Sequence, residues 1–173
     1  MRAHRNPALR SSAQAGFTLV ELVIVILILG ILSAVALPRF FDLGKDARTA
    51  KAEAIHGAVR SAAQIVRAAA LVRGQTDAGP SGNSEVALDG VTVQTNHGYP
   101  EASESGIIAA ASLDPNNDKL TVTGGGSNAG STITIQVQGA TTPANCQITY
   151  TSPDLAASPT VTAPVITLTK GGC

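Results

Sequence analysis

The chain has 173 residues, of which 44% are hydrophobic and only 3% aromatic, and its formal net charge is zero. This length accommodates one ordinary domain with residues left over for an extended element. The chain has three Phe, two Tyr and no Trp. It therefore cannot form a long stacked aromatic array, which argues against an electron-conducting assembly.

The charges are distributed unevenly along the chain. Residues 1–16 contain three Arg and no acid, residues 39–73 contain seven basic residues against three acidic ones, and residues 74–173 contain two basic residues against eight acidic ones. Nucleic-acid binding needs clustered Lys and Arg to neutralise phosphates, so the acidic C-terminal part is not expected to bind nucleic acid. A basic stem and an acidic head would suit packing of the stem of one copy against the head of another.

Residues 1–16 are polar, basic and without periodicity, and we interpret them as a leader peptide. An ordinary secretory signal has its small-residue cleavage site after the apolar core. Here the small residue, Gly16, precedes the apolar run. Cleavage after Gly16 would therefore keep the apolar segment in the mature chain.

The segment Phe17 to Leu37 is continuously apolar apart from Thr18, Glu21 and Ser33. As a helix it would measure about 31 Å, which is enough to cross the hydrocarbon core of a bilayer. We therefore predict a transmembrane and assembly helix over residues 17–38. Gly30 and Pro38 are its weak points, because Gly loosens a helix and Pro removes a backbone hydrogen bond.

Residues 39–74 have the pattern of the amphipathic half of the same long helix, with Gly74 as its stop signal. Apolar residues recur there every three or four positions, which predicts one buried face. The predicted face consists of Ala47, Ala50, Ala54, Ala58, Ala62, Ile65, Ala69 and Val72.

Residues 75–173 have the pattern of a connecting loop followed by a small antiparallel sheet. Asp89-Gly90 between two short alternating runs predicts a hairpin. PEASESGIIAAASL predicts a short helix or an irregular connection. Further strands, rich in Thr, Val and Ile, are predicted at 119–123, 132–138, 147–151 and 165–169. The fold class is thus α+β, with one long helix packed on the sheet.

Two cysteines, Cys146 and Cys173, lie in this C-terminal part. An even number of cysteines after a membrane-targeting segment indicates an oxidising compartment and one disulfide. Closing a loop of roughly 28 residues stabilises a chain by about 3–4 kcal/mol in the chain-entropy model.

The stretch G-F-T-L-V-E-L at 16–22, followed by an apolar run with Gly30 and Pro38, resembles the leader junction and first helix of type IV pilins and related pseudopilins. ANCQITYT and the terminal GGC resemble the disulfide-bounded region of type IVa pilins. With NHGYPEAS in the middle, the chain is most similar to major pilins of the mannose-sensitive haemagglutinin type.

This resemblance implies a pilin fold and a set of residue roles. Gly16 and Phe17 would flank the bond cut by a prepilin peptidase, which would also N-methylate Phe17. The helix between Gly30 and Pro38 would loosen when subunits pack, and Cys146 and Cys173 would bound a surface-exposed variable region. One departure is that Gln14-Ala15 precede the cleavage site, where many family leaders have a basic residue.

Glu21 lies within the apolar run, where an unpaired carboxylate is costly and therefore seeks a partner. Cleavage would create a positive amine at Phe17, and methylation would keep its charge. Glu21 could then pair with the amine of its own chain, about one turn away, or with that of a neighbouring copy. The second pairing would couple neutralisation to assembly. The alternative is that the acid is tolerated near the membrane interface.

Other candidate sites have weaker patterns. Asp114, Asn116 and Asp118 match the start of a calcium loop, but Lys119 stands where its Gly belongs and its final Glu is missing. We interpret them as a turn. His4, His56 and His97 form no metal-ligand set, and no catalytic arrangement of Ser, His and Asp is present. We therefore expect neither an enzyme nor a cofactor.

The sequence thus predicts a structural subunit of a surface filament used for attachment. It would be inserted once in the inner membrane, processed by the peptidase and N-methyltransferase, and polymerised by the pilus assembly machinery into an extracellular helical homo-oligomer. One alternative is a pseudopilin of a type II secretion or DNA-uptake machine. A second is a membrane-tethered binding module that does not polymerise.

Overall fold

The computed structural model describes residues 17–76, 83–154 and 162–173; within these ranges, the side chains of residues 38–42 and 83 lie outside the description. The predicted leader, including Gly16, therefore lies outside the described residues. The chain divides into two units, Met1–Phe41 and Asp42–Cys173.

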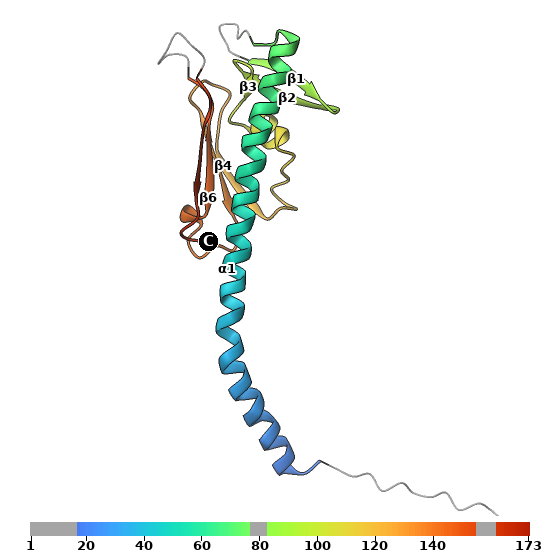
Figure 1. Cartoon of the computed structure of the whole chain (residues 1–173), viewed down its shortest axis with the longest axis vertical. Helices are drawn as coiled ribbons and strands as arrows, with labels where there is room; N and C mark the ends of the chain where they lie inside the picture. The colour runs from blue at the N-terminus through green and yellow to red at the C-terminus, as the bar shows by residue number, and fades with distance from the viewer. Residues whose placement is uncertain (1–16, 77–82, 155–161) are drawn as a thin grey trace, which may run out of the picture. The chain divides into compact units, whose positions relative to one another are not determined.

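The predicted long helix is present as α1, Leu19–Arg73, with 55 residues (Figure 1). It ends at the predicted stop signal. Gly74 has a left-handed φ of 65°, which a residue without a Cβ adopts at little cost. Its amide donates to the carbonyl of Leu71, and the amide of Gln75 donates to that of Ala70, so the last carbonyls of the helix are paired.

The remaining elements form two antiparallel sheets and two short helical segments. The first sheet contains β1 (Asn83–Leu88), β2 (Val91–Asn96) and β3 (Tyr99–Pro100) in that order. The second contains β4 (Leu120–Gly124), β5 (Thr132–Val137), β6 (Gln147–Thr151) and β7 (Val165–Thr169) in that order. The helical segments are η1 (Glu104–Ile108) and η2 (Pro143–Asn145).

The prediction of a single sheet was therefore too simple. After Pro100 the chain leaves the first sheet and enters η1. Among the described residues, one isolated bridge, Ala102 to Gly126, pairs the segment between β3 and η1 with the segment after β4. Pro100 has no amide hydrogen to donate to a further strand, which suits its place on the edge strand of this sheet.

Two tight hairpins build the first sheet. The predicted turn at Asp89-Gly90 joins Leu88 to Val91, and both turn residues have positive φ, 46° and 82°. A second turn of the same kind, His97-Gly98, has φ of 51° and 76°. Positive φ at both central positions is the geometry that matches the twist of the flanking strands. This second hairpin was not predicted from the sequence.

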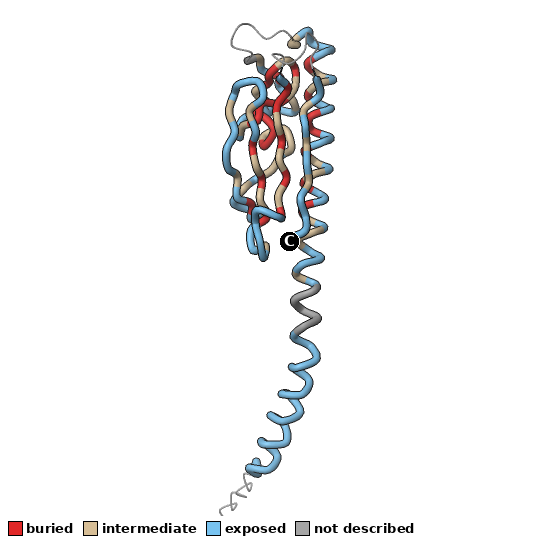
Figure 2. Tube along the Cα trace, turned by 90° about the vertical axis from the view of Figure 1, so that its left-hand side faces the viewer, coloured by how far each residue is buried: buried red, intermediate tan, exposed pale blue. Residues whose placement is uncertain are grey.

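The buried face of α1 differs from the predicted face. Ala47, Ala50, Ala54 and Ile65 are exposed, and Val72 is 88% exposed. Of the predicted face, Ala62 is buried and Ala58 and Ala69 are partly buried. The other buried residues of α1 are Ala52, Ile55, Val59, Ala63, Val66 and Ala70 (Figure 2). Because α1 carries alanine on every side, its sequence contains more than one apolar stripe, and contact with the sheets decides which stripe is buried.

The buried residues form two clusters along α1. The larger cluster joins α1 from Ala52 to Ala63 with Ile107 and Ile108 of η1, the second sheet and the two cysteines. The smaller cluster joins Val66 and Ala70 with Val86 of β1 and Val93 of β2. Each sheet therefore packs on its own stretch of α1, and burial of these side chains is the main favourable term in holding the sheets on the helix.

The predicted irregular connection contains η1. The Ser103 hydroxyl caps it by accepting a 3.0 Å hydrogen bond from the Gly106 amide. Gly106 has non-helical angles, φ −95° and ψ −105°, and a Cβ at this position would lie 2.3 Å from the carbonyl oxygen of Glu101. Glycine is thus required by close approach of the backbone.

Candidate functional site

The apolar segment Leu19–Leu37 is the one stretch among the described residues that is long and apolar enough to cross a membrane. All of its residues are exposed (Figure 2). A cleavable signal sequence would pass the same test of length and composition. Length and composition alone therefore do not distinguish a retained helix from a cleaved signal sequence.

Glu21 is held at the start of α1 by Thr18. Its Oε2 accepts hydrogen bonds of 2.9 Å from both the amide and the hydroxyl of Thr18. In return, the Thr18 hydroxyl accepts from the Glu21 amide at 3.2 Å. This reciprocal pairing is a capping box, which satisfies amides that have no partner at the beginning of a helix. The sequence signal for this capping box, T-x-x-E at residues 18–21, is present, but the box was not predicted.

Gly30 and Pro38 both fall within the bounds of α1. A Cβ placed on Gly30 would meet nothing within 4 Å, so no close contact within the chain requires glycine there. Nearby, the Ser33 hydroxyl donates a 2.7 Å hydrogen bond to the carbonyl of Leu29. The predicted loosening at Gly30 and Pro38 remains a prediction.

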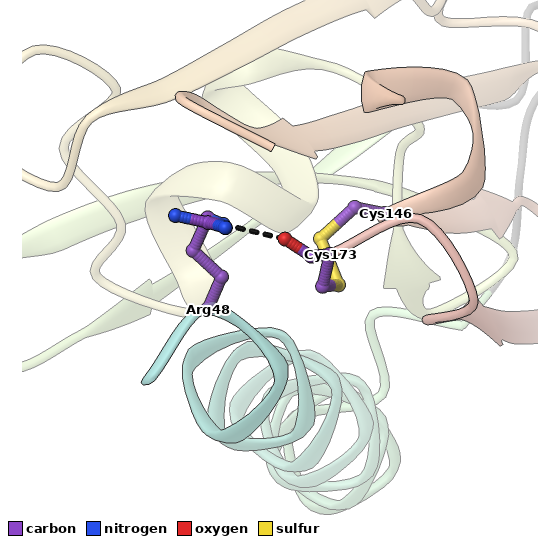
Figure 3. The surroundings of a disulfide bond; sticks show 3 residues. All are labelled: Arg48, Cys146 and Cys173. Atoms are coloured by element: carbon purple, nitrogen blue, oxygen red, sulfur yellow. Dashed lines mark hydrogen bonds between the residues drawn. A yellow bond between two sulfur atoms is a disulfide. The ribbon is translucent and has the colours of Figure 1, made fainter. Parts of the chain in front are cut away.

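Cys146 and Cys173 form a disulfide, with their Cα atoms 4.8 Å apart (Figure 3). Both cysteines are buried in the larger cluster. Two backbone hydrogen bonds lie beside the disulfide, from the Thr142 amide to the Gly172 carbonyl and from the Gly172 amide to the Asn145 carbonyl. The residues after β7 are therefore fixed against η2 by covalent and hydrogen bonds together.

Arg48 ties the same region to α1. Its Nε donates a 2.5 Å hydrogen bond to the backbone carbonyl of Cys173 (Figure 3). In addition, Lys170 and Glu53 form an ion pair with an N–O distance of 2.5 Å. Because both side chains of that pair are about half exposed, it adds little stability compared with the buried disulfide.

The basic character of α1 is largely used inside the chain. Four of its cations donate to backbone carbonyls of the two sheets and their connections: Arg48 to Cys173, Lys51 to Asp118, Arg67 to His97 and Arg73 to Ala87. A charged donor to a backbone carbonyl is a stronger hydrogen bond than a neutral one. The basic stem therefore has an intramolecular use that its sequence alone did not indicate.

The weak calcium candidate forms a turn. The Asp114 carboxylate accepts from the amides of Asn116 and Asn117, and the Asp118 carboxylate accepts from the Asp114 amide. These backbone bonds hold the pKa of Asp114 below its ordinary value. Asp114 thus acts as the local turn cap that the sequence predicted.

The two histidines within the described residues, His56 and His97, lie on different elements of the fold. His56 lies on α1, while His97 occupies the second hairpin turn and its carbonyl accepts a 2.6 Å hydrogen bond from Arg67. Partial burial and the Arg67 charge both lower the pKa of His97. No group of three metal-ligating side chains occurs among the described residues.

Two buried polar residues were not predicted. Tyr150 on β6 is fully buried, and its hydroxyl donates a 2.7 Å hydrogen bond to the carbonyl of Pro100. Glu101 is 3% exposed, its Oε2 accepts a 3.4 Å bond from Ser103, and its Oε1 has no hydrogen-bond partner among the described residues. Burial raises the pKa of Glu101, an effect that the Ser103 bond partly offsets.

Residues 11–37 match the family model of the prokaryotic N-terminal methylation motif. The type IV narrow pilus major component PilA5 of Thermus thermophilus is 58% identical over 50 residues, which are 29% of this chain and 43% of that protein. The type IV major alpha-pilin of Moraxella bovis is 43% identical over 65 residues, or 38% of each chain.

A longer similarity links this chain to the type IV major fimbrial protein FimA of Dichelobacter nodosus, with 33% identity over 132 residues. These residues are 74% of this chain and 77% of FimA. No solved structure matches the chain significantly. The match to FimA covers most of both chains, and the methylation motif covers the leader junction and the apolar helix. The chain therefore belongs to the type IV pilin family.

Proposed function

We propose that this chain is a structural subunit of a type IV pilus, which polymerises through its N-terminal helix into a surface filament for attachment. The observation that carries the proposal is the combination of the methylation motif at residues 11–37 with a relative that is named a major fimbrial protein and is similar over 132 residues. The long helix with an apolar, exposed N-terminal segment supports it.

In this proposal, a prepilin peptidase cuts between Gly16 and Phe17 and methylates the new amine. Mass spectrometry of the N-terminal peptide from shed filaments tests this step. The expected peptide begins at an N-methylated Phe17. A mature chain that begins after Ala34 or Ala36 would instead identify an ordinary signal peptide and would contradict retention of the helix.

Glu21 is the proposed assembly residue. Thr18 engages its Oε2, while Oε1 makes no hydrogen bond within the described residues. A carboxylate has enough lone pairs to accept further donors at the second oxygen. The cap within the chain therefore leaves Glu21 able to accept the charged amine of Phe17 from an incoming copy. Such a pair contributes register and specificity more reliably than net stability.

Two substitutions separate the charge of Glu21 from its shape. Glu21→Gln keeps the side-chain length and a capping oxygen but removes the charge, whereas Glu21→Asp keeps the charge on a shorter side chain. We expect Glu21→Gln to lower the filament yield at least tenfold while membrane insertion is unchanged, and Glu21→Asp to retain more assembly. Normal yield and subunit order in Glu21→Gln would refute the proposed role.

Before assembly, the chain would be anchored once in the inner membrane, with the part after α1 in the periplasm. Gly30 and Pro38 would then let the helix lengthen locally when subunits pack, since both residues weaken helical hydrogen bonding. Gly30→Ala tests this step. The expected result is a stable precursor with fewer or shorter filaments, and unchanged filaments would contradict the role of Gly30.

Cell fractionation and cross-linking together separate this proposal from the two alternatives. A pilus subunit is recovered in long filaments that are sheared from the cell surface. A pseudopilin of a secretion or DNA-uptake machine stays in the membrane and periplasm. Cross-linking through cysteines placed on the exposed apolar helix separates a membrane-tethered module, because a chain that does not polymerise gives no ladder of oligomers.

A further inference from the structure

A pocket of about 340 Å³ lies against α1 and between the exposed edges of the two sheets. One wall is Tyr99 of β3, which is the last strand of the first sheet, and the other is Ile166 of β7, which is the last strand of the second. The volume falls within the range of small-molecule sites. Nothing in the proposed pilus function makes use of this pocket.

The two walls are held in place by contacts behind them. Tyr150, whose register partner on β7 is Ile166, donates its hydroxyl hydrogen bond to Pro100, the neighbour of Tyr99. The Arg67 guanidinium lies over the Tyr99 ring, 4.9 Å from its centroid. Fixed walls matter for binding, because a preformed pocket loses little conformational entropy when it takes up a ligand.

Arg60 supplies the charge of the pocket. Arg60 is exposed. It makes no hydrogen bond or ion pair within the described residues, whereas four other cations of α1 donate to backbone carbonyls. The lining residues include no Asp or Glu. A guanidinium keeps its charge at every physiological pH and binds carboxylates through two parallel hydrogen bonds.

The other lining residues define the rest of the ligand. His56 and Gln64 lie on α1 with Arg60 and offer further hydrogen-bonding groups. The Tyr99 ring, Pro164 and Ile166 present apolar surface on the opposite side. A ligand that satisfies all of these walls has one carboxylate, several hydroxyl groups and one apolar face.

We propose that this pocket binds a small ligand with one carboxylate, and that sugar acids are the class that fits all of its walls. Arg60 pairs with the carboxylate, Gln64 and His56 bind ring hydroxyls, and the C–H face of the sugar ring packs on Tyr99. A phosphate ligand fits less well, because phosphate sites use several cations or a helix N-terminus, and the pocket has one guanidinium in the middle of a helix.

Isothermal titration calorimetry with the unassembled full chain in detergent micelles tests this inference. The probe is D-glucuronate, and D-glucose and inorganic phosphate are the controls. We expect saturable binding of glucuronate that is at least tenfold tighter than that of either control. Binding of glucose or phosphate with equal affinity, or no saturable binding of glucuronate, would overturn the proposal.

Matched variants locate the site. Arg60→Gln should weaken glucuronate binding at least tenfold, and Arg60→Lys should weaken it less. Lys119→Gln should leave it unchanged, because Lys119 is also an exposed cation without a partner in the described residues but does not line the pocket. Equal binding by Arg60→Gln would overturn the proposal.

Arg60 could instead pair with an acidic side chain of a second copy of this chain. In that case Arg60→Gln would abolish self-association of the chain and glucuronate would not bind. This pair of results would show the proposal to be wrong. The measurement uses unassembled chains, so its failure is distinguishable from a failure of filament formation.

Discussion

The hydroxyl of Tyr150 donates a 2.7 Å hydrogen bond to the backbone carbonyl of Pro100, and this bond joins β6 of one sheet to β3 of the other. Both residues are buried. Burial raises the pKa of Tyr150 far above its ordinary value, and an electrostatic contribution from Tyr99 adds to this effect, so the hydroxyl stays protonated as a donor.

Tyr150→Phe keeps the packing of the ring and removes this one bond. We expect the free energy of unfolding to fall by roughly 1–3 kcal/mol, because the bond is lost in a buried environment. Denaturant unfolding of the full chain in micelles measures the change. Tyr99→Phe is the control and should change stability by less than half as much, since Tyr99 is only partly buried.

Glu101→Gln tests the buried carboxylate. Because burial raises the pKa of Glu101, the folded state binds its proton more tightly than the unfolded state. The contribution of Glu101 to the free energy of unfolding is then greatest below its ordinary pKa of 4.5. This contribution is lost as the pH rises through the pKa of the folded state. Glu101→Gln should therefore be more stable than the wild type at pH 7, and this advantage should vanish below about pH 4.5.

Thermal unfolding at a series of pH values measures this difference. Glu104→Gln serves as the control because Glu104 is an exposed neighbour, and it should leave the pH profile unchanged. If Glu101→Gln lowered the stability at pH 7, the carboxylate would have to be stabilising, contrary to this interpretation.

Gly106 and Gly57 form a matched pair of glycines. A Cβ at Gly106 would lie 2.3 Å from the Glu101 carbonyl oxygen, whereas a Cβ at Gly57 would meet nothing within 4 Å. Gly106→Ala should destabilise the fold by at least about 2 kcal/mol, since backbone must move. Gly57→Ala should stabilise α1 by up to about 1 kcal/mol, since alanine favours a helix. Equal unfolding midpoints for the two variants would contradict the structure of η1.

Removal of the disulfide tests how firmly the C-terminal residues are attached. Cys146 and Cys173 are 27 residues apart, and the chain-entropy model gives about 3–4 kcal/mol for a loop of this size. The double variant Cys146→Ser, Cys173→Ser should lose about this free energy of unfolding. A reducing agent should destabilise the wild type to a similar extent and leave the variant unaffected.

Thr18→Ala separates helix capping from assembly. The substitution removes the hydroxyl that accepts from the Glu21 amide, and loss of an N-cap typically costs about 0.5–2 kcal/mol. Faster hydrogen exchange in the first turn of α1 should report this loss, and Thr18→Ser should restore protection. Because Glu21 keeps its charge, filament yield should fall far less than in Glu21→Gln. An equal fall in both variants would indicate that Glu21 acts through the cap.

The sequence by itself determined the elements that depend on local chemistry. The length and apolarity of residues 17–37 predict a helix of membrane length, and α1 covers them from Leu19 onward. Asp89-Gly90 predicts a turn with positive φ, which is present. The strands at 147–151 and 165–169 follow directly from alternating Thr, Val and Ile. Gly74 ends α1 as predicted because a left-handed residue closes the last carbonyls of a helix.

The tertiary structure decided which of several equivalent patterns is used. Alanine covers every side of α1, so only contact with the sheets determines that Ala52 and Val59 are buried while Ala50 and Ala54 are exposed. The sequence indicates that the cations of α1 form a basic stem. In the structure, however, Arg48 and Arg67 donate to the backbone carbonyls of Cys173 and His97, which are distant from them in the sequence. Such partners, like the edges that form the pocket beside Arg60, come together only when the two sheets pack on the helix.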